Sequence, residues 1–129
     1  MRENLFKGIR EDNGEWIYGD LLHDHYLCRE DEITQIYDHK SKLTHRENVV
    51  ISETVGQYTG IRDINADKIF EHDIVRKYVD GKELIGVVEF SDGAFGVRFA
   101  DGSGQLLCFF GDCCEIIGNI HNDPEITLE

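Results

Sequence analysis

Long apolar runs are missing from this sequence. No stretch approaches the roughly 18 consecutive apolar residues that a membrane-spanning helix needs. The opening residues, MRENLFKGIR, contain no apolar segment of the kind that marks a signal peptide. Hydrophobic residues still make up 40% of the 129 positions, enough for a chain of single-domain size to bury a core. We therefore expect a soluble protein with no membrane association that stays in the cytoplasm.

Standard catalytic motifs are also missing. The sequence contains no phosphate-binding GxxxxGK[ST] loop, no GxGxxG, no GxSxG and no HExxH. Its 26 aspartates and glutamates are so numerous that no pair of carboxylates stands out as a candidate acid and base. The sequence therefore predicts no catalytic residue and no cofactor. An enzyme whose site is dispersed along the chain is kept as an alternative.

Basic residues are scarce. The 13 lysines and arginines are outnumbered by the acidic residues, and the formal net charge is −13. Proteins bind nucleic acid largely by neutralising its phosphates, and a surface this acidic repels duplex DNA. Direct nucleic-acid binding is therefore not expected. The charge keeps the protein soluble and is compatible with a basic protein partner, while a protein that mimics the charge of DNA is a further alternative.

Candidate metal ligands are present, but their spacing is poor. The pair His23-x-His25 could supply imidazole ligands, yet it falls in a predicted turn. A second group has the chemistry of zinc ligands without the paired spacing of structural zinc sites: Cys108, Cys113, Cys114 and His121. Adjacent cysteines in a strand point to opposite faces, so we expect one of the two at positions 113 and 114 to be a buried core residue. We predict no metal site and no disulfide framework.

Short β-strands separated by turn residues dominate the first half of the chain. Residues 5–10 and 15–22 are predicted to form a hairpin around Asn13-Gly14, a dipeptide that suits a type I′ turn. Further short strands are expected at residues 26–29, 32–37 and 49–51, with a polar loop at 38–47.

The second half shows the clearest alternation. Strands are predicted at residues 73–78, 84–90, 94–99, 105–110 and 113–117, with turns at Asp80-Gly81 and Asp92-Gly93. A meander of short strands is typical of a small barrel or sandwich. The predicted fold class is therefore mainly β, with an N-terminal β-hairpin region (residues 1–54) packed with a C-terminal SH3-like barrel region and tail (residues 55–129). We expect the two regions to form one compact unit.

The stretch from Val55 to Arg76 lies at the centre of this organisation. Thr59-Gly60 is predicted to turn the chain, and the Asp63 to Asp67 segment contains residues whose side chains bond their own backbone. Two apolar pairs flank the acidic segment Glu71-His72-Asp73. We expect Asp63 and Asp73 to accept backbone N–H groups at the turns. The residues expected in the core beside them are Tyr58, Ile69, Phe70, Ile74 and Val75.

This stretch resembles the YopX family of phage and prophage proteins. The resemblance rests on QYTG at Gln57–Gly60, on the turn from Asp63 to Lys68 and on IFEHDIV at Ile69–Val75. The segments FKGIREDNGEWIYGDLL at 6–22 and IIGNIHNDPEI at 116–126 agree with it. The family motif is expected to be structural: Gln57, Tyr58, Thr59, Gly60, Asp63, Ile69, Glu71, Asp73, Gly118 and Asn119. The resemblance implies a mostly β, phage-derived protein inside a bacterial host cell, and it implies no catalytic residues.

Two positions depart from the family pattern. The family usually has Asn-Gly where this chain has Asn65-Ala66, and Glu-Gly-Asp where it has Glu71-His72-Asp73. A non-glycine residue with positive φ costs on the order of 1 kcal/mol. Because such residues are uncommon, we expect ordinary backbone geometry at Ala66 and His72. On that expectation, the substitution His72→Gly destabilises the protein.

These observations favour a phage or prophage accessory protein that is not an enzyme and acts by binding another protein. Its partner is unknown, and a basic partner or a second copy of the chain would fit. The two alternatives from other classes are the enzyme with a dispersed site and the nucleic-acid-associated or DNA-mimicking protein.

Overall fold

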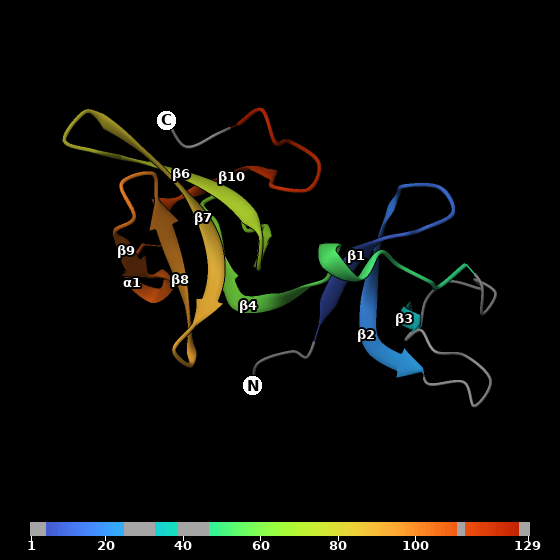
Figure 1. The fold of residues 1–129 in the computed structure, drawn as a ribbon. Helices are drawn as coiled ribbons and strands as arrows, with labels where there is room; N and C mark the ends of the chain where they lie inside the picture. Colours follow the sequence, from blue (N-terminus) through green and yellow to red (C-terminus); the bar gives the residue numbers. More distant parts are fainter. Residues whose placement is uncertain (1–4, 25–32, 39–46, 111–112, 127–129) are drawn as a thin grey trace. The chain divides into compact units, whose positions relative to one another are not determined.

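The computed structural model describes residues 5–24, 33–38, 47–110 and 113–126. The chain divides into two compact units, Met1–Gln57 (unit 1) and Tyr58–Glu129 (unit 2), and both consist mainly of antiparallel strands (Figure 1). The mainly β prediction is therefore confirmed. In the described ranges, no helix has the length and apolar character needed to cross a membrane. The strand predicted at residues 26–29 lies outside these ranges.

Unit 1 is a small sheet. Its strands are β1 (Phe6–Ile9), β2 (Trp16–Asp24) and β3 (Ile33–Tyr37), to which β4 (Gly56–Arg62) adds its first two residues beside β1. Apolar residues from these strands and their connections form its core: Ile17, Ile36 and Val50, with Phe6, Leu21 and Val55 packed against them. Gly19 is required where β2 meets β3, because a Cβ atom there would lie 1.9 Å from the carbonyl oxygen of Tyr37.

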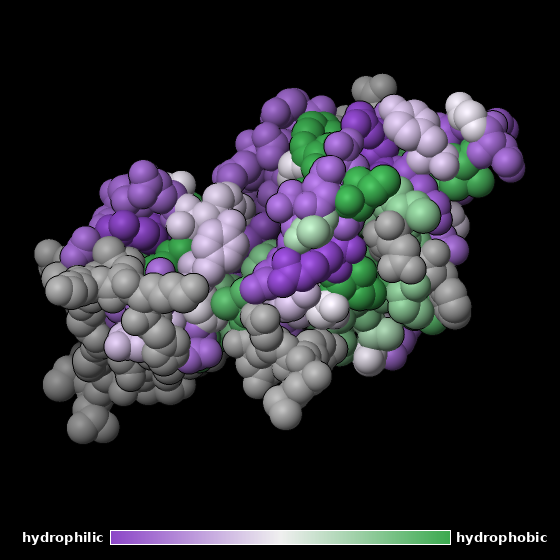
Figure 2. Space-filling view, turned by 180° about the vertical axis from the view of Figure 1, so that it is seen from behind, coloured by the Kyte–Doolittle hydropathy of each residue, from purple (hydrophilic) through white to green (hydrophobic). Residues whose placement is uncertain are grey.

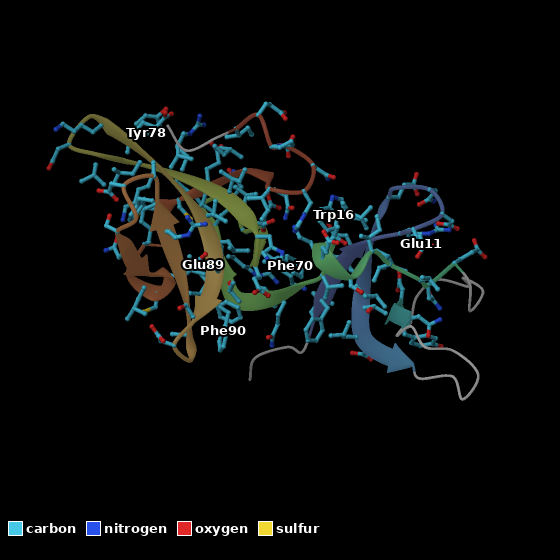
Figure 3. All side chains as sticks on the ribbon, viewed as in Figure 1. Glu11, Trp16, Phe70, Tyr78, Glu89 and Phe90 are labelled. Atoms are coloured by element: carbon cyan, nitrogen blue, oxygen red, sulfur yellow. The ribbon has the colours of Figure 1, made fainter. Side chains whose placement is uncertain are left out.

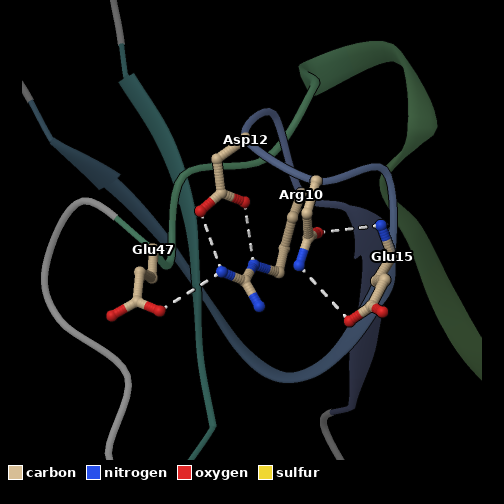
Figure 4. A network of polar contacts seen from close by, with 5 residues as sticks. Arg10, Asp12, Glu15 and Glu47 are labelled. Atoms are coloured by element: carbon tan, nitrogen blue, oxygen red, sulfur yellow. Dashed lines mark hydrogen bonds and ion pairs between the residues drawn. The ribbon is translucent and has the colours of Figure 1, made fainter.

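The connection between β1 and β2 is longer than predicted. The strands pair up to Ile9 and Trp16, so residues 10–15 all belong to the connection, and within it only Gly14 has a positive φ, at 75°. The predicted two-residue type I′ turn at Asn13-Gly14 is therefore wrong, although the hairpin itself is present. The loop is closed one step earlier than a turn at Asn13-Gly14 requires, because the N–H of Arg10 donates to the carbonyl of Glu15 at 2.8 Å and the N–H of Gly14 donates to the carbonyl of Arg10 at 3.0 Å. Figure 4 shows that the Arg10 guanidinium also donates to both carboxylate oxygens of Asp12, at 3.0 and 2.8 Å.

The end of unit 1 is held by a short helical turn. The predicted strand at 49–51 forms only isolated bridges, and the 3-10 helix η1 (Ser52–Thr54) follows it. The hydroxyl of Thr54 accepts a hydrogen bond from the N–H of Ile9 at 2.9 Å and donates one to the carbonyl of Ile51 at 2.6 Å. This hydroxyl fastens η1 to the end of β1.

Unit 2 contains a five-stranded antiparallel sheet in the order β10-β6-β7-β8-β9. Its strands are β6 (Asp73–Val79), β7 (Lys82–Ser91), β8 (Ala94–Phe99), β9 (Gly104–Leu106) and β10 (Glu115–Asn119), while β5 (Lys68–Phe70) pairs with β4. Among the described residues the edge strands β10 and β9 do not pair with each other. The sheet is not closed, and the predicted SH3-like barrel is not confirmed.

Two tight hairpins connect the central strands of unit 2. Asp80 and Gly81 have φ values of 51° and 79°, and Asp92 and Gly93 have values of 53° and 81°. Positive φ at both central residues is the mark of a type I′ turn, whose twist matches that of the flanking strands. Both of these predicted turns are confirmed.

The core of unit 2 includes a short helix that the sequence pattern did not predict. The expected strand at 105–110 is wrong after Leu106, because the chain continues as α1 (Leu107–Phe110). Residues three apart lie on the same side of a helical turn, and Leu107 and Phe110 are both buried, at 0% and 1% exposure. They join a cluster that contains Ile69, Val75, Val88, Val97 and Cys114.

The central stretch has the predicted core and an unpredicted backbone. All five of its expected core residues are buried, with exposed fractions of 6% or less: Tyr58, Ile69, Phe70, Ile74 and Val75. The predicted turn at Thr59-Gly60 is wrong, because β4 runs on through both residues. Gly60 instead has a φ of 87°, and the register of β4 against β5 shifts between Tyr58 and Arg62, as in a β-bulge.

The expectation of ordinary backbone at the two departures from the family pattern is also wrong. Ala66 has a φ of 65° and His72 has a φ of 77°. Both residues sit in the left-handed region that favours glycine, and each costs about 1–2 kcal/mol relative to ordinary geometry. The tight connections on either side of β5 impose these angles, and the chain tolerates the strain.

Candidate functional site

Asp63 stabilises the turn before β5. One oxygen of its carboxylate, Oδ1, accepts the N–H groups of Asn65 and Asp67, each at 2.9 Å. The other, Oδ2, accepts the N–H group of Ile116 in β10 at 3.0 Å. The side chain is 6% exposed. The predicted bonding of Asp63 to backbone N–H groups is confirmed, and all three of these bonds use the carboxylate structurally.

Asp73 has a similar role at the start of β6. Its carboxylate accepts the N–H of Phe70 at 2.8 Å and the side-chain amide of Asn119 at 3.0 Å, in a position that is 1% exposed. Asn119 in turn accepts the N–H of His121 at 3.0 Å. The prediction for Asp73 is also confirmed, and Asn119 extends the network to the segment after β10.

Several of the other family-motif residues of unit 2 make contacts within the strands on either side of these turns. The Tyr58 ring contacts Phe70 with centroids 5.7 Å apart, and the Thr59 hydroxyl donates to the carbonyl of Ile69 at 2.8 Å. Gly118 lies at a register shift of β10, where a Cβ atom would approach the Asp123 carboxylate to 2.9 Å. Gln57 and Glu71 are half-buried. The structural role of the whole motif stays a prediction.

The predicted metal candidates do not assemble. Cys108 and Cys113 are exposed, whereas Cys114 is buried, as expected for one of two adjacent cysteines. His25 and the side chain of His23 lie outside the described residues. In the parts of the chain that the structure describes, no group of three or more His, Cys, Asp or Glu side chains is placed to hold a metal ion.

The buried cysteine is also a poor nucleophile. Burial, with the nearby charge of Asp63 as a second cause, raises the pKa of the Cys114 thiol to about 11. The reactive form of cysteine is the thiolate, and catalytic cysteines have lowered pKa values. Cys114 therefore packs in the core as a neutral thiol.

An open groove of ≈ 450 Å³ lies on the sheet of unit 2, on the face opposite the core. The pairing register places Glu89 of β7, Gly96 of β8 and Leu106 of β9 in one row across three strands. A neighbouring row pairs Arg98 with Gly104. Because glycine has no side chain, the first row is hollow in its middle, at Gly96, and the second row is hollow at its β9 end, at Gly104.

The groove is acidic, with one compensating cation. Glu89 and Asp92 contribute carboxylates, and Arg98 is the basic residue among the described lining residues. The Nε atom of Arg98 lies 3.1 Å from Oε2 of Glu89, and both side chains are well exposed, at 52% and 39%. An exposed ion pair of this kind contributes only about 0–1 kcal/mol, so a ligand cation can compete for Glu89.

Exposed hydrophobic residues do not by themselves mark a second site. Figure 2 shows hydrophobic residues interspersed with hydrophilic ones on one face of the molecule. Figure 3 shows two exposed aromatic residues of unit 2, Tyr78 on β6 and Phe90 on β7, on separate parts of the sheet. Single exposed apolar side chains are normal on protein surfaces. The glycine-hollowed groove is therefore the best-defined candidate site in the described residues.

Sequence reasoning missed this groove. Phe95, Val97 and Phe99 alternate along the strand predicted at residues 94–99 and therefore share one face, which is the face that packs in the core. The same alternation leaves Ala94, Gly96 and Arg98 on the other face. Two small residues beside one arginine could have indicated a hollow with a charged side chain on that face. The partner residues on β7 and β9 depend on the register, which the sequence pattern does not give.

The fold and the site together define a two-unit, mainly β protein. Its features are an acidic corner, formed by the turns on either side of β5 with the buried Asp63 and Asp73, and an open acidic groove on β7, β8 and β9. The chain belongs to the YopX family: the family model described as "YopX protein" matches residues 5–128, nearly the whole chain. A similar solved structure is the crystal structure of protein EF1440 from Enterococcus faecalis, with a TM-score of 0.55 and 20% identity over 100% of both chains. That likeness shows the shared fold alone. No curated protein matches the chain.

Proposed function

We propose that this chain is a non-enzymatic, protein-binding module of phage or prophage origin that works in the cytoplasm of its bacterial host. Its docking site is the groove on β7, β8 and β9, and its ligand is a short, extended, basic segment of a partner protein. The observation that carries the proposal is the glycine-hollowed row from Glu89 through Gly96 to Leu106.

The shape of the groove suits an extended segment. Its volume of ≈ 450 Å³ falls within the range of about 300–1,000 Å³ that ligand sites occupy. Ala94, Gly96, Val97 and Arg98 of β8 line it, and at about 3.3 Å per residue this length of strand accommodates three or four residues of an extended peptide. A Cβ atom at Gly96 would already lie 3.3 Å from the carbonyl of Gln105, so larger residues at position 96 would fill the groove.

The charge of the groove supports a basic ligand. The methylene groups of a lysine or arginine can cover Ala94 and Leu106 while the charged head reaches Glu89 or Asp92, as long basic side chains commonly do. Hydrogen bonds between such a head and a carboxylate are among the stronger ones in proteins. The net charge of −13 adds a long-range attraction that concentrates cations near the surface.

The test is the binding of a fluorescent lysine- and arginine-rich octapeptide, measured by anisotropy at physiological salt with the full chain. The test variant is Glu89→Gln/Asp92→Asn, which removes two carboxylates from the groove. The matched control is Asp80→Asn/Glu83→Gln, which also removes one aspartate and one glutamate charge, but at the other type I′ hairpin, between β6 and β7. We expect the groove variant to weaken binding about tenfold, or 1.4 kcal/mol, and the control variant to change it less than about twofold.

Equal losses in both variants would mean that the peptide follows net charge alone, and the proposal would fail. The absence of peptide binding to the wild type would also overturn it. Duplex DNA is the second probe, and we expect it to bind more weakly than the ordinary non-specific range of about 10⁻⁴–10⁻⁶ M. Micromolar binding of DNA would instead support the nucleic-acid alternative. A groove variant that converts a dimer to a monomer would identify a second copy of the chain as the occupant.

A further inference from the structure

Two histidines that are far apart in the sequence meet beside the acidic corner. His72 lies between β5 and β6, and His121 follows β10. Nδ1 of His72 lies 3.3 Å from Nε2 of His121, and the two rings are nearly perpendicular, at 80° with centroids 4.9 Å apart. Neither the groove nor the core network described above accounts for this pair.

The backbone holds both histidines in place. The N–H of His72 donates to the carbonyl of Val88 at 2.7 Å, and the carbonyl of His72 accepts the N–H of Ile120 at 3.1 Å. The N–H of His121 donates to Oδ1 of Asn119, whose amide is bound to the buried Asp73. These bonds attach the backbones of the two histidines to β7 and to the Asp73 network, so the positions from which the two rings meet are set by the fold. Sites that bind metals need this kind of support for their ligands.

His72 also adopts a strained backbone conformation. Its φ of 77° is one that non-glycine residues rarely adopt. Strain of this kind is found preferentially where a side chain has a function that offsets its cost. Ala66, the neighbouring strained residue, has only a methyl side chain, whereas the strained position at 72 carries an imidazole that faces a second imidazole.

The separation of the two nitrogens matches the needs of a metal ion. Two histidine nitrogens bound to a tetrahedral Zn²⁺ at 2.0–2.1 Å lie about 3.3–3.4 Å from each other. The observed separation is 3.3 Å. On the far side of the His72 ring, Oε2 of Glu71 lies 3.9 Å from Nε2. At 3.9 Å the carboxylate lies beyond hydrogen-bond distance, but its negative charge favours a proton on Nε2 of His72 and leaves Nδ1 as the ligand nitrogen.

We propose that His72 and His121 form a two-histidine binding site for a divalent transition-metal ion such as Zn²⁺ or Ni²⁺. The metal takes the place of the hydrogen that the two rings share. His72 binds it through Nδ1 with its proton on Nε2, facing Glu71, and His121 binds it through Nε2 after its proton moves to Nδ1. No third ligand joins them among the described residues, so water completes the coordination and the site is an open one.

The first test is a calorimetric titration of the full chain with Ni²⁺ under reducing conditions. The test variants are His72→Gly, which suits the positive φ, and His121→Ala. The control is His23→Ala/His25→Ala, which removes the other closely spaced histidine pair and keeps every cysteine. Each test variant should weaken binding at least about tenfold, and the control should change it less than about twofold. Equal affinities in all four proteins, or a loss confined to the control, would overturn the proposal.

A second measurement uses the wild type alone, so it does not depend on the folding of any variant. Long-range proton–nitrogen correlation spectra resolve the ring nitrogens of each histidine. Addition of Zn²⁺ should shift Nδ1 of His72 and Nε2 of His121 together, with the same dependence on metal concentration. If these nitrogens do not shift, the pair is a hydrogen-bonded contact only.

Discussion

The two units of the chain differ in how much apolar packing supports their polar features. Unit 1 has a small core around Ile17, Ile36 and Val50. Among the residues that the structure describes, the core of unit 2 is larger, with seven buried residues and five more packed against them. Its corner keeps two aspartates buried and two non-glycine residues in left-handed conformations. The comparison teaches that backbone strain and buried carboxylates occur in the unit whose larger apolar core can offset their free-energy cost.

The buried polar side chains of unit 2 are also better supplied with hydrogen bonds than those of unit 1. In unit 2, each buried carboxylate of the corner accepts more than one hydrogen bond, as Asp63 and Asp73 show. In unit 1, the buried side-chain oxygen of Asn48 accepts no hydrogen bond from any described residue. An unsatisfied buried polar atom costs about 1–3 kcal/mol. We therefore expect unit 2 to be the more stable of the two.

The largest predicted effect compares two isoleucines that are both 0% exposed, Ile69 in unit 2 and Ile36 in unit 1. Replacing a buried isoleucine by alanine costs about 2–5 kcal/mol, depending on how far the surroundings collapse. We expect Ile69→Ala to lie near the upper end of that range and Ile36→Ala near the lower end. Urea unfolding followed by Trp16 fluorescence reports unit 1, because Trp16 is the single tryptophan; far-UV circular dichroism reports both units.

Coincident transitions by the two probes in both variants would break the comparison, because they would show that the units unfold as one. Equal costs for the two substitutions would also count against it.

The next effect concerns the polar anchors. Asp73→Ala leaves the buried N–H of Phe70 and the amide of Asn119 without their acceptor, at a cost of about 1–3 kcal/mol for each unsatisfied donor. Thr54→Val removes the hydroxyl that fastens η1 to β1 and keeps the shape of the side chain. It leaves the N–H of Ile9 without its acceptor and should cost about 1–3 kcal/mol in total. Melting temperatures of the two variants test the difference, and a smaller shift for Asp73→Ala than for Thr54→Val would contradict it.

A smaller effect, of opposite sign, tests the strain. Because Ala66 has a φ of 65°, Ala66→Gly relieves the left-handed strain, although glycine also widens the unfolded ensemble. The net gain should be up to about 1 kcal/mol. His72→Gly should also stabilise, but by less, because it removes the contact with His121. This reverses the expectation from the sequence. A fall in melting temperature for Ala66→Gly would show that position 66 carries no strain.

The smallest predicted effect is a loss of folding stability at alkaline pH, caused by Cys114 in unit 2. The pKa of Cys114 is raised to about 11 in the folded state, above that of an unfolded cysteine, about 8.5. The unfolded state therefore loses its proton first as the pH rises, and the stability that the neutral thiol contributes is lost between those values. The wild type should lose more stability between pH 8 and pH 10.5 than Cys114→Ala does. Parallel pH profiles from urea titrations would refute this.

Local signals in the sequence were sufficient for much of the fold. Strict alternation predicted β8, and Asp-Gly dipeptides predicted both type I′ hairpins of unit 2. The apolar pairs around Glu71 predicted the core of the corner, and the short polar side chains of Asp63 and Asp73 predicted their bonds to backbone N–H groups. Each of these features is set by residues within a few positions of one another, or by the simple distinction between apolar and polar side chains.

The remaining features depend on distant residues. The third bond of Asp63 reaches Ile116, 53 positions away, and His72 meets His121 across 49 positions. The strain at Ala66 and His72 follows from the tight connections around β5, not from the preferences of alanine and histidine. The groove requires the register of β7, β8 and β9. The helix α1 requires Leu107 and Phe110 to fill the core together, which periodicity over four residues cannot signal.

The central claim is that the groove of unit 2 binds a basic segment and that unit 1 does not. It is tested most directly by titrating the ¹⁵N-labelled full chain with the lysine- and arginine-rich octapeptide and following every backbone amide. We predict shifts confined to residues 89–106 of β7, β8, β9 and their connections, with the amides of β1, β2 and β3 unchanged. Shifts centred on unit 1, or small shifts spread over the acidic surface of both units, would contradict the claim.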